Sequence, residues 1–134
     1  PVKTYMETRC NQPLVIISVN TFYQEKYSAP VEGKYVHAYR ITIENKSAFT
    51  YQLLRRRWEI FDAAEEFKIV EGDGVVGLQP ILEPGESHTY VSGCNLKSGL
   101  GKMKGSYLME KLFDGKKVEV SIPEFQLIAN IFHN

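Results

Sequence analysis

The sequence has few cysteines, no long apolar run and no excess of charge of either sign. Its longest apolar runs, such as residues 14–17, are far shorter than the ~20 residues of a membrane-spanning helix, and its start shows no signal-peptide pattern. Lysine and arginine total 16, as do aspartate and glutamate, so the chain lacks the positive charge that drives binding to nucleic acids or anionic membranes. Two cysteines, Cys10 and Cys94, do not make the disulfide framework of a small secreted domain. We therefore predict a cytoplasmic protein with free thiols that binds neither nucleic acid nor membrane.

The chain does contain apolar side chains arranged with a period of two. Hydrophobic residues make up 43% of its 134 residues, which is enough for the core of one domain spanning residues 1–134. In residues 35–45 one face is apolar or aromatic, which is typical of a half-buried strand: Tyr35, His37, Tyr39, Ile41 and Ile43. Comparable runs lie at about 14–23, 51–61, 67–71, 87–94, 104–110, 117–122 and 125–131.

These runs predict an all-β fold. No stretch of 12 or more residues carries a convincing helical stripe, and turn residues such as Asp114 and Gly115 separate the runs. Short strands without intervening helices favour antiparallel pairing. We therefore expect an antiparallel β-sandwich of about eight strands, similar to immunoglobulin and fibronectin type III domains.

One segment matches the pattern G-x-G-x-x-G through Gly72, Gly74 and Gly77. In a dinucleotide-binding fold this pattern follows a strand and opens a helix whose N-terminus faces the phosphates. Here prolines follow at positions 80 and 84, which prevent such a helix, and acidic residues flank the first glycine. We interpret the three glycines as turn residues with positive φ, and a nucleotide or pyrophosphate site as the alternative.

The densest charge is the run Arg55, Arg56 and Arg57 directly before Trp58. Guanidinium groups bind phosphates and acidic peptides, and an indole offers a stacking surface. Within a strand the three arginines must divide between two faces: Arg56 shares the face of Trp58, whereas Arg55 and Arg57 share the other. Arg55, Arg57 and Trp58 are therefore the candidates for binding a partner, and an ordinary ion-paired, solvent-exposed face is the alternative.

No catalytic or metal-binding constellation is visible. His37, His88 and His133 are scattered and have no second ligand at a typical spacing. His37 lies among apolar neighbours, so we interpret it as a hydrogen-bonded core histidine. Cys94 has no nearby group that would activate its thiol. We predict no metal site, no cofactor and no enzymatic activity.

Several segments form a specific combined motif. They include Val-Glu-Gly-Asp-Gly-Val-Val-Gly-Leu-Gln-Pro at 70–80, Leu-Glu-Pro-Gly-Glu at 82–86, Tyr-Val-Ser-Gly-Cys at 90–94, Met-Lys-Gly-Ser-Tyr at 103–107, Ala-Tyr-Arg-Ile-Thr-Ile-Glu-Asn at 38–45 and Trp-Glu-Ile-Phe-Asp at 58–62. Together they resemble the ApaG family over about residues 15–129. The resemblance implies a single ApaG domain with a fibronectin type III-like sandwich fold.

The resemblance also implies a function. Bacterial ApaG proteins are linked to cobalt resistance and magnesium efflux without an established catalytic activity. Related eukaryotic domains occur in F-box subunits of ubiquitin ligases, where protein binding is the expected role. We therefore expect a non-enzymatic binding domain with a protein partner; the alternative is a nucleotide- or pyrophosphate-binding or hydrolytic protein that uses residues 72–77 with a divalent metal. The sequence is compatible with a monomer or a homodimer, and with a stand-alone bacterial protein or a domain of a larger eukaryotic one.

Overall fold

The computed structural model describes residues 3–6 and 14–130. Cys10 and His133, which were considered above, lie outside the described residues. In the described part the chain forms nine strands and two short 3₁₀ helices: β1 (Lys3–Met6), β2 (Val15–Tyr23), η1 (Glu25–Tyr27), η2 (Pro30–Glu32), β3 (Tyr35–Asn45), β4 (Tyr51–Asp62), β5 (Glu66–Asp73), β6 (Ile81–Leu82), β7 (Ser87–Leu96), β8 (Leu100–Lys111) and β9 (Lys117–Ile128).

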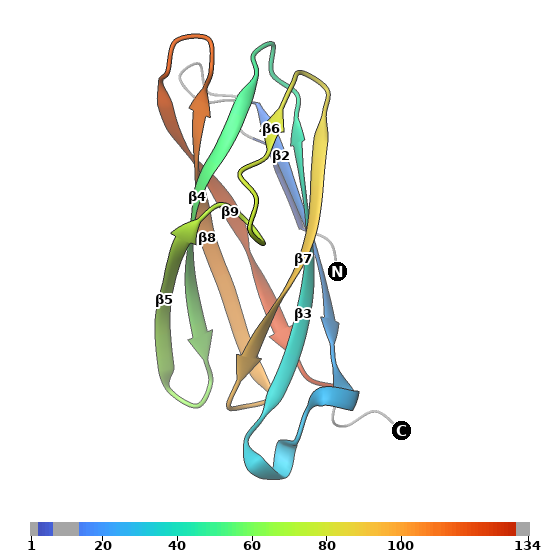
Figure 1. The fold of residues 1–134 in the computed structure, drawn as a ribbon. Helices are drawn as coiled ribbons and strands as arrows, with labels where there is room; N and C mark the ends of the chain where they lie inside the picture. The colour runs from blue at the N-terminus through green and yellow to red at the C-terminus, as the bar shows by residue number, and fades with distance from the viewer. Residues whose placement is uncertain (1–2, 7–13, 131–134) are drawn as a thin grey trace.

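The strands form two sheets that face each other (Figure 1). One sheet has the strand order β1-β2-β3-β7, and the other has the order β5-β4-β8-β9, with β6 paired to the start of β4. The paired strands run antiparallel in both sheets. The prediction of an all-β antiparallel sandwich is therefore confirmed.

The boundaries differ from the prediction at β9. Two runs separated by Pro123 were expected to be separate strands, but they form one strand. The register of β8 against β9 shifts between Met103 and Gly105, so Pro123 lies at an irregularity where the strand tolerates a missing N–H group. The sequence pattern does not predict β1 or β6, because strands of 4 and 2 residues are too short to show a period.

The core lies between the sheets and comes from the inward-facing half of each strand. Its largest fully buried side chains include Ile17, Ile41, Leu53, Met103, Tyr107 and Leu127. His37 belongs to this core, as expected, and is 1% exposed. However, its Nε2 has no hydrogen-bond partner among the described residues, so the expected hydrogen bond is not found at that atom. Burial lowers the pKa of His37, which favours the neutral ring.

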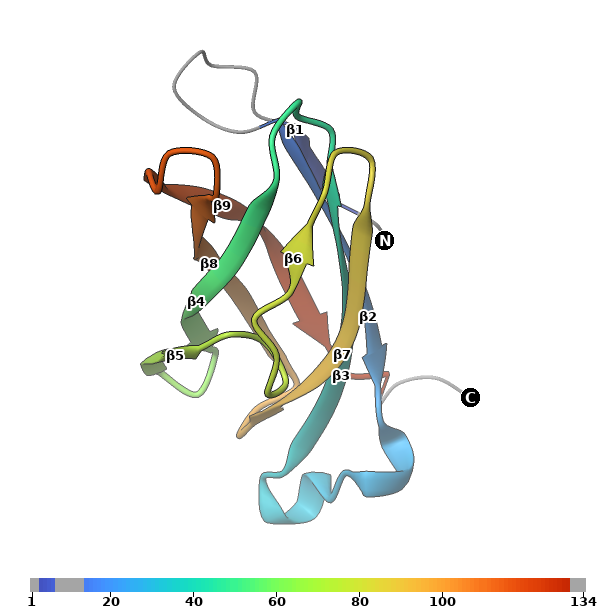
Figure 2. The ribbon, with the colours of Figure 1, turned by 45° about the horizontal axis from the view of Figure 1, so that its top comes forward.

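The two long sides of the sandwich differ. On one side β9 packs against β1 and β2. On the other side β5 and β7 are the outermost strands of their sheets, and the segment that links β5 to β6 runs between the sheets (Figure 2). The outer edge of such a strand presents backbone N–H and C=O groups without a strand partner. We refer to the side between β5 and β7 as the open side.

Candidate functional site

A cavity of about 440 Å³ lies on the open side of the sandwich, a size typical of ligand pockets. Strands β4 and β5 form one wall, and β3 and β7 form the other. The lining residues are Tyr39, Arg56, Trp58, Ile60, Lys68, Val70, Ser92, Gly93, Cys94 and Asn95. Strand alternation explains part of this set, because Arg56, Trp58 and Ile60 are every second residue of β4 and therefore face inward together.

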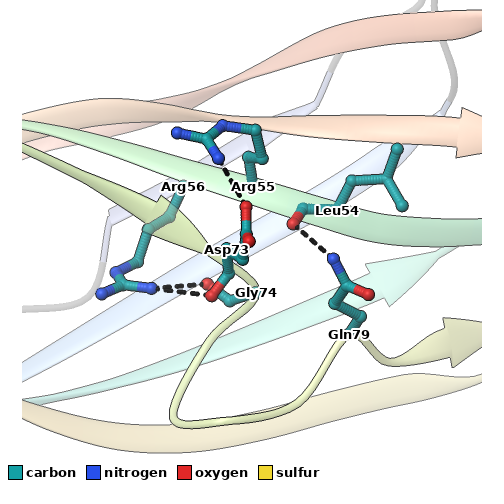
Figure 3. A network of polar contacts seen from close by, with 6 residues as sticks. All are labelled: Leu54, Arg55, Arg56, Asp73, Gly74 and Gln79. Atoms are coloured by element: carbon teal, nitrogen blue, oxygen red, sulfur yellow. Dashed lines mark hydrogen bonds and ion pairs between the residues drawn. The ribbon is translucent and has the colours of Figure 1, made fainter.

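Arg56 is held over the inner face of β5. Its Nη1 donates hydrogen bonds of 3.0 Å to the backbone carbonyl oxygens of Asp73 and Gly74 (Figure 3). Gly72 is paired with Arg56 across the two strands, and a Cβ at this position would lie 2.9 Å from Nη2 of the guanidinium. Gly72 does not have positive φ, contrary to our interpretation from the sequence. The glycine instead leaves room for the end of the Arg56 side chain to cross the strand, and a larger residue there would displace the guanidinium.

The other two glycines of the motif shape a tight hairpin. Val75 and Leu78 exchange two backbone hydrogen bonds of 2.8 and 3.0 Å. The two residues between them, Val76 and Gly77, have φ angles of +46° and +78°, as in a type I′ turn. Gly74 has a φ of +63°, and a Cβ there would overlap the carbonyl oxygen of Leu78. Gly74 and Gly77 therefore have the positive φ expected of turn residues.

The N–H groups of this hairpin are already bonded to the protein. The N–H of Gly74 donates to the carbonyl oxygen of Leu54 at 2.8 Å, and those of Val75 and Leu78 bond to each other's carbonyl groups. Leu54 is the extra residue where the register of β4 against β8 shifts, and its carbonyl also accepts from Nε2 of Gln79 at 3.0 Å (Figure 3). Strand β6 follows, not a helix. These three N–H groups are therefore not free for a phosphate, and no helix N-terminus adjoins them.

The structure does not bring the three partner-binding candidates together. Arg55 and Arg57 lie on the outer face of the sheet, where they pair with Asp73 at 2.5 Å and Glu59 at 2.6 Å. Trp58 points the other way, is 3% exposed, and packs edge-on against two core aromatic rings. The two arginines thus resemble an ordinary ion-paired face, and the buried indole leaves little surface for stacking.

The cavity carries positive charge. Arg56 and Lys68 are the only residues of its lining with a formal charge at neutral pH. Burial raises the pKa of Tyr39 and raises that of Cys94 to about 11, so both remain neutral at pH 7. Sequence reasoning did not select Lys68. The sequence places Lys68 on the same face of its strand as Val70 and Gly72, but only the sheet order shows that this face shares a cavity with Arg56.

Within residues 3–6 and 14–130, no three histidine, cysteine, aspartate or glutamate side chains are grouped so that they could hold a metal ion. In the same part of the chain, no helix has the length and apolar character that spanning a membrane would need.

Comparisons with known proteins agree on one family. The model of the ApaG domain matches residues 25–111. Protein ApaG of Brucella abortus is 48% identical over 111 residues, which cover 83% of this chain and 85% of that protein. Protein ApaG of Vibrio vulnificus is 44% identical over 124 residues, covering 92% and 98%. The crystal structure of a Bordetella pertussis protein described as ApaA superposes with a TM-score of 0.83 at 38% identity, covering 87% of this chain and 94% of that one. The chain therefore belongs to the ApaG domain family.

Proposed function

We propose that this ApaG domain is a non-enzymatic, cytoplasmic protein-binding domain that docks its partner on the free edge of β5. The observation that carries the proposal is the character of this edge strand. Phe67, Ile69 and Val70 of β5 are 50%, 48% and 39% exposed, and no proline interrupts the strand. An exposed apolar edge strand is a template for an added strand from another chain.

The other edges are less suited to this role. Strand β9, at the far edge of the same sheet, contains Pro123 at an irregularity and packs against β1 and β2. At the free edge of β7, the outward-facing residues are largely polar or glycine: Ser87, Thr89, Gly93 and Asn95 are exposed together with Val91. Prolines, irregularities and polar side chains protect an edge from pairing. Strand β5 contains neither a proline nor an irregularity, and its charged residues are interspersed with the exposed apolar side chains of Phe67, Ile69 and Val70.

The chemistry of the site favours binding over catalysis. The cavity combines two cations with a tyrosine and a buried thiol whose raised pKa makes it a weak nucleophile. The N–H groups of Gly74, Val75 and Leu78 in the hairpin are already bonded within the protein, which argues against the alternative of a nucleotide or pyrophosphate site. The curated relatives carry the name Protein ApaG, which specifies no reaction.

The association of the family with cobalt and magnesium is proposed to act through a partner. Mg²⁺ needs clustered oxygen ligands and Co²⁺ prefers imidazole or thiolate sets, and no such group of three is found among the described residues. We expect both ions to bind in the millimolar range or more weakly. Titration calorimetry checks this; a stoichiometric micromolar Co²⁺ isotherm that is lost in His37→Ala or His88→Ala would contradict it.

The docking surface is tested by affinity purification with matched edge variants. The tagged chain is compared with Ile69→Lys, which places a charge on the edge of β5, and with Ile128→Lys on β9. The two isoleucines are 48% and 53% exposed, so the substitutions cost similar apolar surface. Mass spectrometry should identify a partner that is retained by Ile128→Lys and lost by Ile69→Lys. Equal retention by both variants would exclude β5 as the docking edge.

A further inference from the structure

Two cations lie along the free edge of β5, on the side that faces the cavity. Lys68 and Val70 line the cavity from β5 itself, and Gly72 is the next residue on the same face of the strand. Arg56 comes from the neighbouring strand, but its guanidinium lies over Gly72 and is fixed there by two carbonyl groups at the end of β5. The positive charges therefore sit at positions 68 and 72 of β5, with one apolar side chain between them.

Neither charge is neutralised within the part of the chain that the structure describes. Arg55 and Arg57, which flank Arg56, both pair with carboxylates, whereas Arg56 and Lys68 do not. Among the described contacts, only Nη1 of Arg56 donates hydrogen bonds, which leaves Nη2 and Nε as donors. Two acids lie on the same side: Asp62 accepts hydrogen bonds from the loop that follows β7, and Glu66, on the same face of β5 as Lys68, pairs with Lys97 at 2.7 Å.

A strand added to β5 would place its side chains in register with these charges. Neighbouring strands lie about 4.8 Å apart, and directly opposite Cβ atoms lie about 5 Å apart. The residues opposite Lys68 and Gly72 are four positions apart in the added strand, whichever way it runs. Both point to the cavity side, and the residue midway between them lies opposite Val70.

Building on the docking edge proposed above, we infer that the partner segment is extended and carries acidic residues at positions i and i+4, with an apolar residue at i+2. One carboxylate binds Lys68, and the other accepts hydrogen bonds from the unused donors of Arg56. The cavity of about 440 Å³ provides room for these side chains, and partial exclusion of water strengthens charge-assisted hydrogen bonds.

Strand β5 of a second copy of this chain does not provide the acidic pattern. A pairing that sets Gly72 of one copy opposite Lys68 of the other brings Arg56 beside that lysine. Like charges directly opposite each other disfavour such a pair. The charge pattern therefore selects a different, acidic segment in preference to self-association at this register.

The test is a selection of short random peptides displayed against the full chain, repeated against Ile69→Lys. Peptides that bind the wild-type chain and lose binding to Ile69→Lys report docking on β5. We expect these peptides to be enriched in pairs of aspartate or glutamate at i and i+4 with valine, isoleucine or leucine at i+2. Spacings of i+3 or i+5 place the second acid on the wrong face and should not be enriched.

One selected peptide is then synthesised and titrated against charge variants. Lys68→Gln and Arg56→Gln should each weaken binding about tenfold, whereas Lys104→Gln, which removes an exposed lysine from the outer face, should not change it. Replacing the peptide acid that binds Lys68 by glutamine should weaken binding by about the same factor. Combining this change with Lys68→Gln should weaken binding little further. Lys68 makes no ion pair within the described residues, so this variant keeps its fold; thermal unfolding verifies that.

Three results would overturn the inference, and they are distinguishable. Peptides that depend on Ile69 but lack the acidic pair would leave the docking edge standing and refute the charge pattern. The absence of any peptide sensitive to Ile69→Lys would refute both the edge and the pattern. Micromolar binding of ATP that is lost in Lys68→Gln, without enriched acidic peptides, would assign the cavity to a small anion.

Discussion

Gly74→Ala should destabilise the fold much more than Gly77→Ala, although both glycines have positive φ, at +63° and +78°. Gly74 is buried, and an added Cβ would lie closer than 3.0 Å to the backbone of Leu78. Around Gly77, nothing lies within 4 Å of the added atom. The pair of variants therefore separates the cost of positive φ from the cost of a collision with the backbone.

The expected losses in the free energy of unfolding follow from these two costs. Positive φ alone costs a residue with a Cβ about 1 kcal/mol, which is the whole expectation for Gly77→Ala. In Gly74→Ala the hairpin must also move, which disrupts the two backbone hydrogen bonds between Val75 and Leu78, each worth about 1 kcal/mol net. We therefore expect a loss of about 3 kcal/mol for Gly74→Ala. At roughly 4 °C per kcal/mol for a domain of this size, Tm should fall by about 12 °C, against about 4 °C for Gly77→Ala.

The assay is urea and thermal unfolding followed by circular dichroism, with an ATP titration of each protein. Equal destabilisation by the two variants would refute the collision between residue 74 and Leu78. ATP and diadenosine tetraphosphate should bind negligibly to the wild type and to Gly74→Ala. If the wild type binds either nucleotide at micromolar affinity, and Gly74→Ala loses that binding at an unchanged Tm, the loop is a nucleotide site and our interpretation of the glycines is wrong.

Three further predictions concern single contacts. Tyr90→Phe and Tyr107→Phe should each cost about 1–2 kcal/mol in urea unfolding, because their buried hydroxyl groups bond to each other, and the double variant should cost less than the sum. Burial alone would raise the pKa of Asp62, but hydrogen bonds from Ser98 and backbone N–H groups lower it. The ionised Asp62 side chain therefore stabilises the fold above about pH 4, and this contribution is lost as the pH falls through the lowered pKa. The difference in unfolding free energy between wild type and Asp62→Asn should accordingly shrink towards pH 3. Val76→Asn should raise stability by about 0.5–1 kcal/mol, because asparagine tolerates the positive φ that a β-branched residue resists; a lower Tm for this variant would contradict the turn assignment.

The strand content of the fold was predictable because it depends on the alternation of side chains within each short segment of sequence. In β3 the inward-facing positions are buried in alternation, as the sequence pattern of residues 35–45 indicates. Pro123 misled the prediction, since a proline normally ends a strand unless the partner strand accommodates an irregularity, and that partner lies elsewhere in the sequence. The hydrogen bond expected at His37 depended on neighbours that alternation does not specify.

The site was predictable only in part, for a related reason. Alternation correctly placed Arg56 with Trp58 and apart from Arg55 and Arg57. The cavity depends on which strands end up outermost in each sheet, and that order is a property of the whole chain. Lys68 belongs to a strand that is exposed on both faces, so its burial pattern carries no signal of an inner side.

The arginine that crosses Gly72 has a consequence for how the family diversifies. Positions 56 and 72 occupy one shared space, because a Cβ at residue 72 would lie 2.9 Å from the guanidinium. We expect the two positions to change together among relatives: where residue 56 is shorter than arginine, residue 72 is released from being glycine. We expect position 74 to stay glycine regardless, since its constraint comes from the backbone of Leu78, and position 77 to accept asparagine. The three glycines of one motif thus answer to three separate constraints, and we expect them to tolerate substitution to different extents.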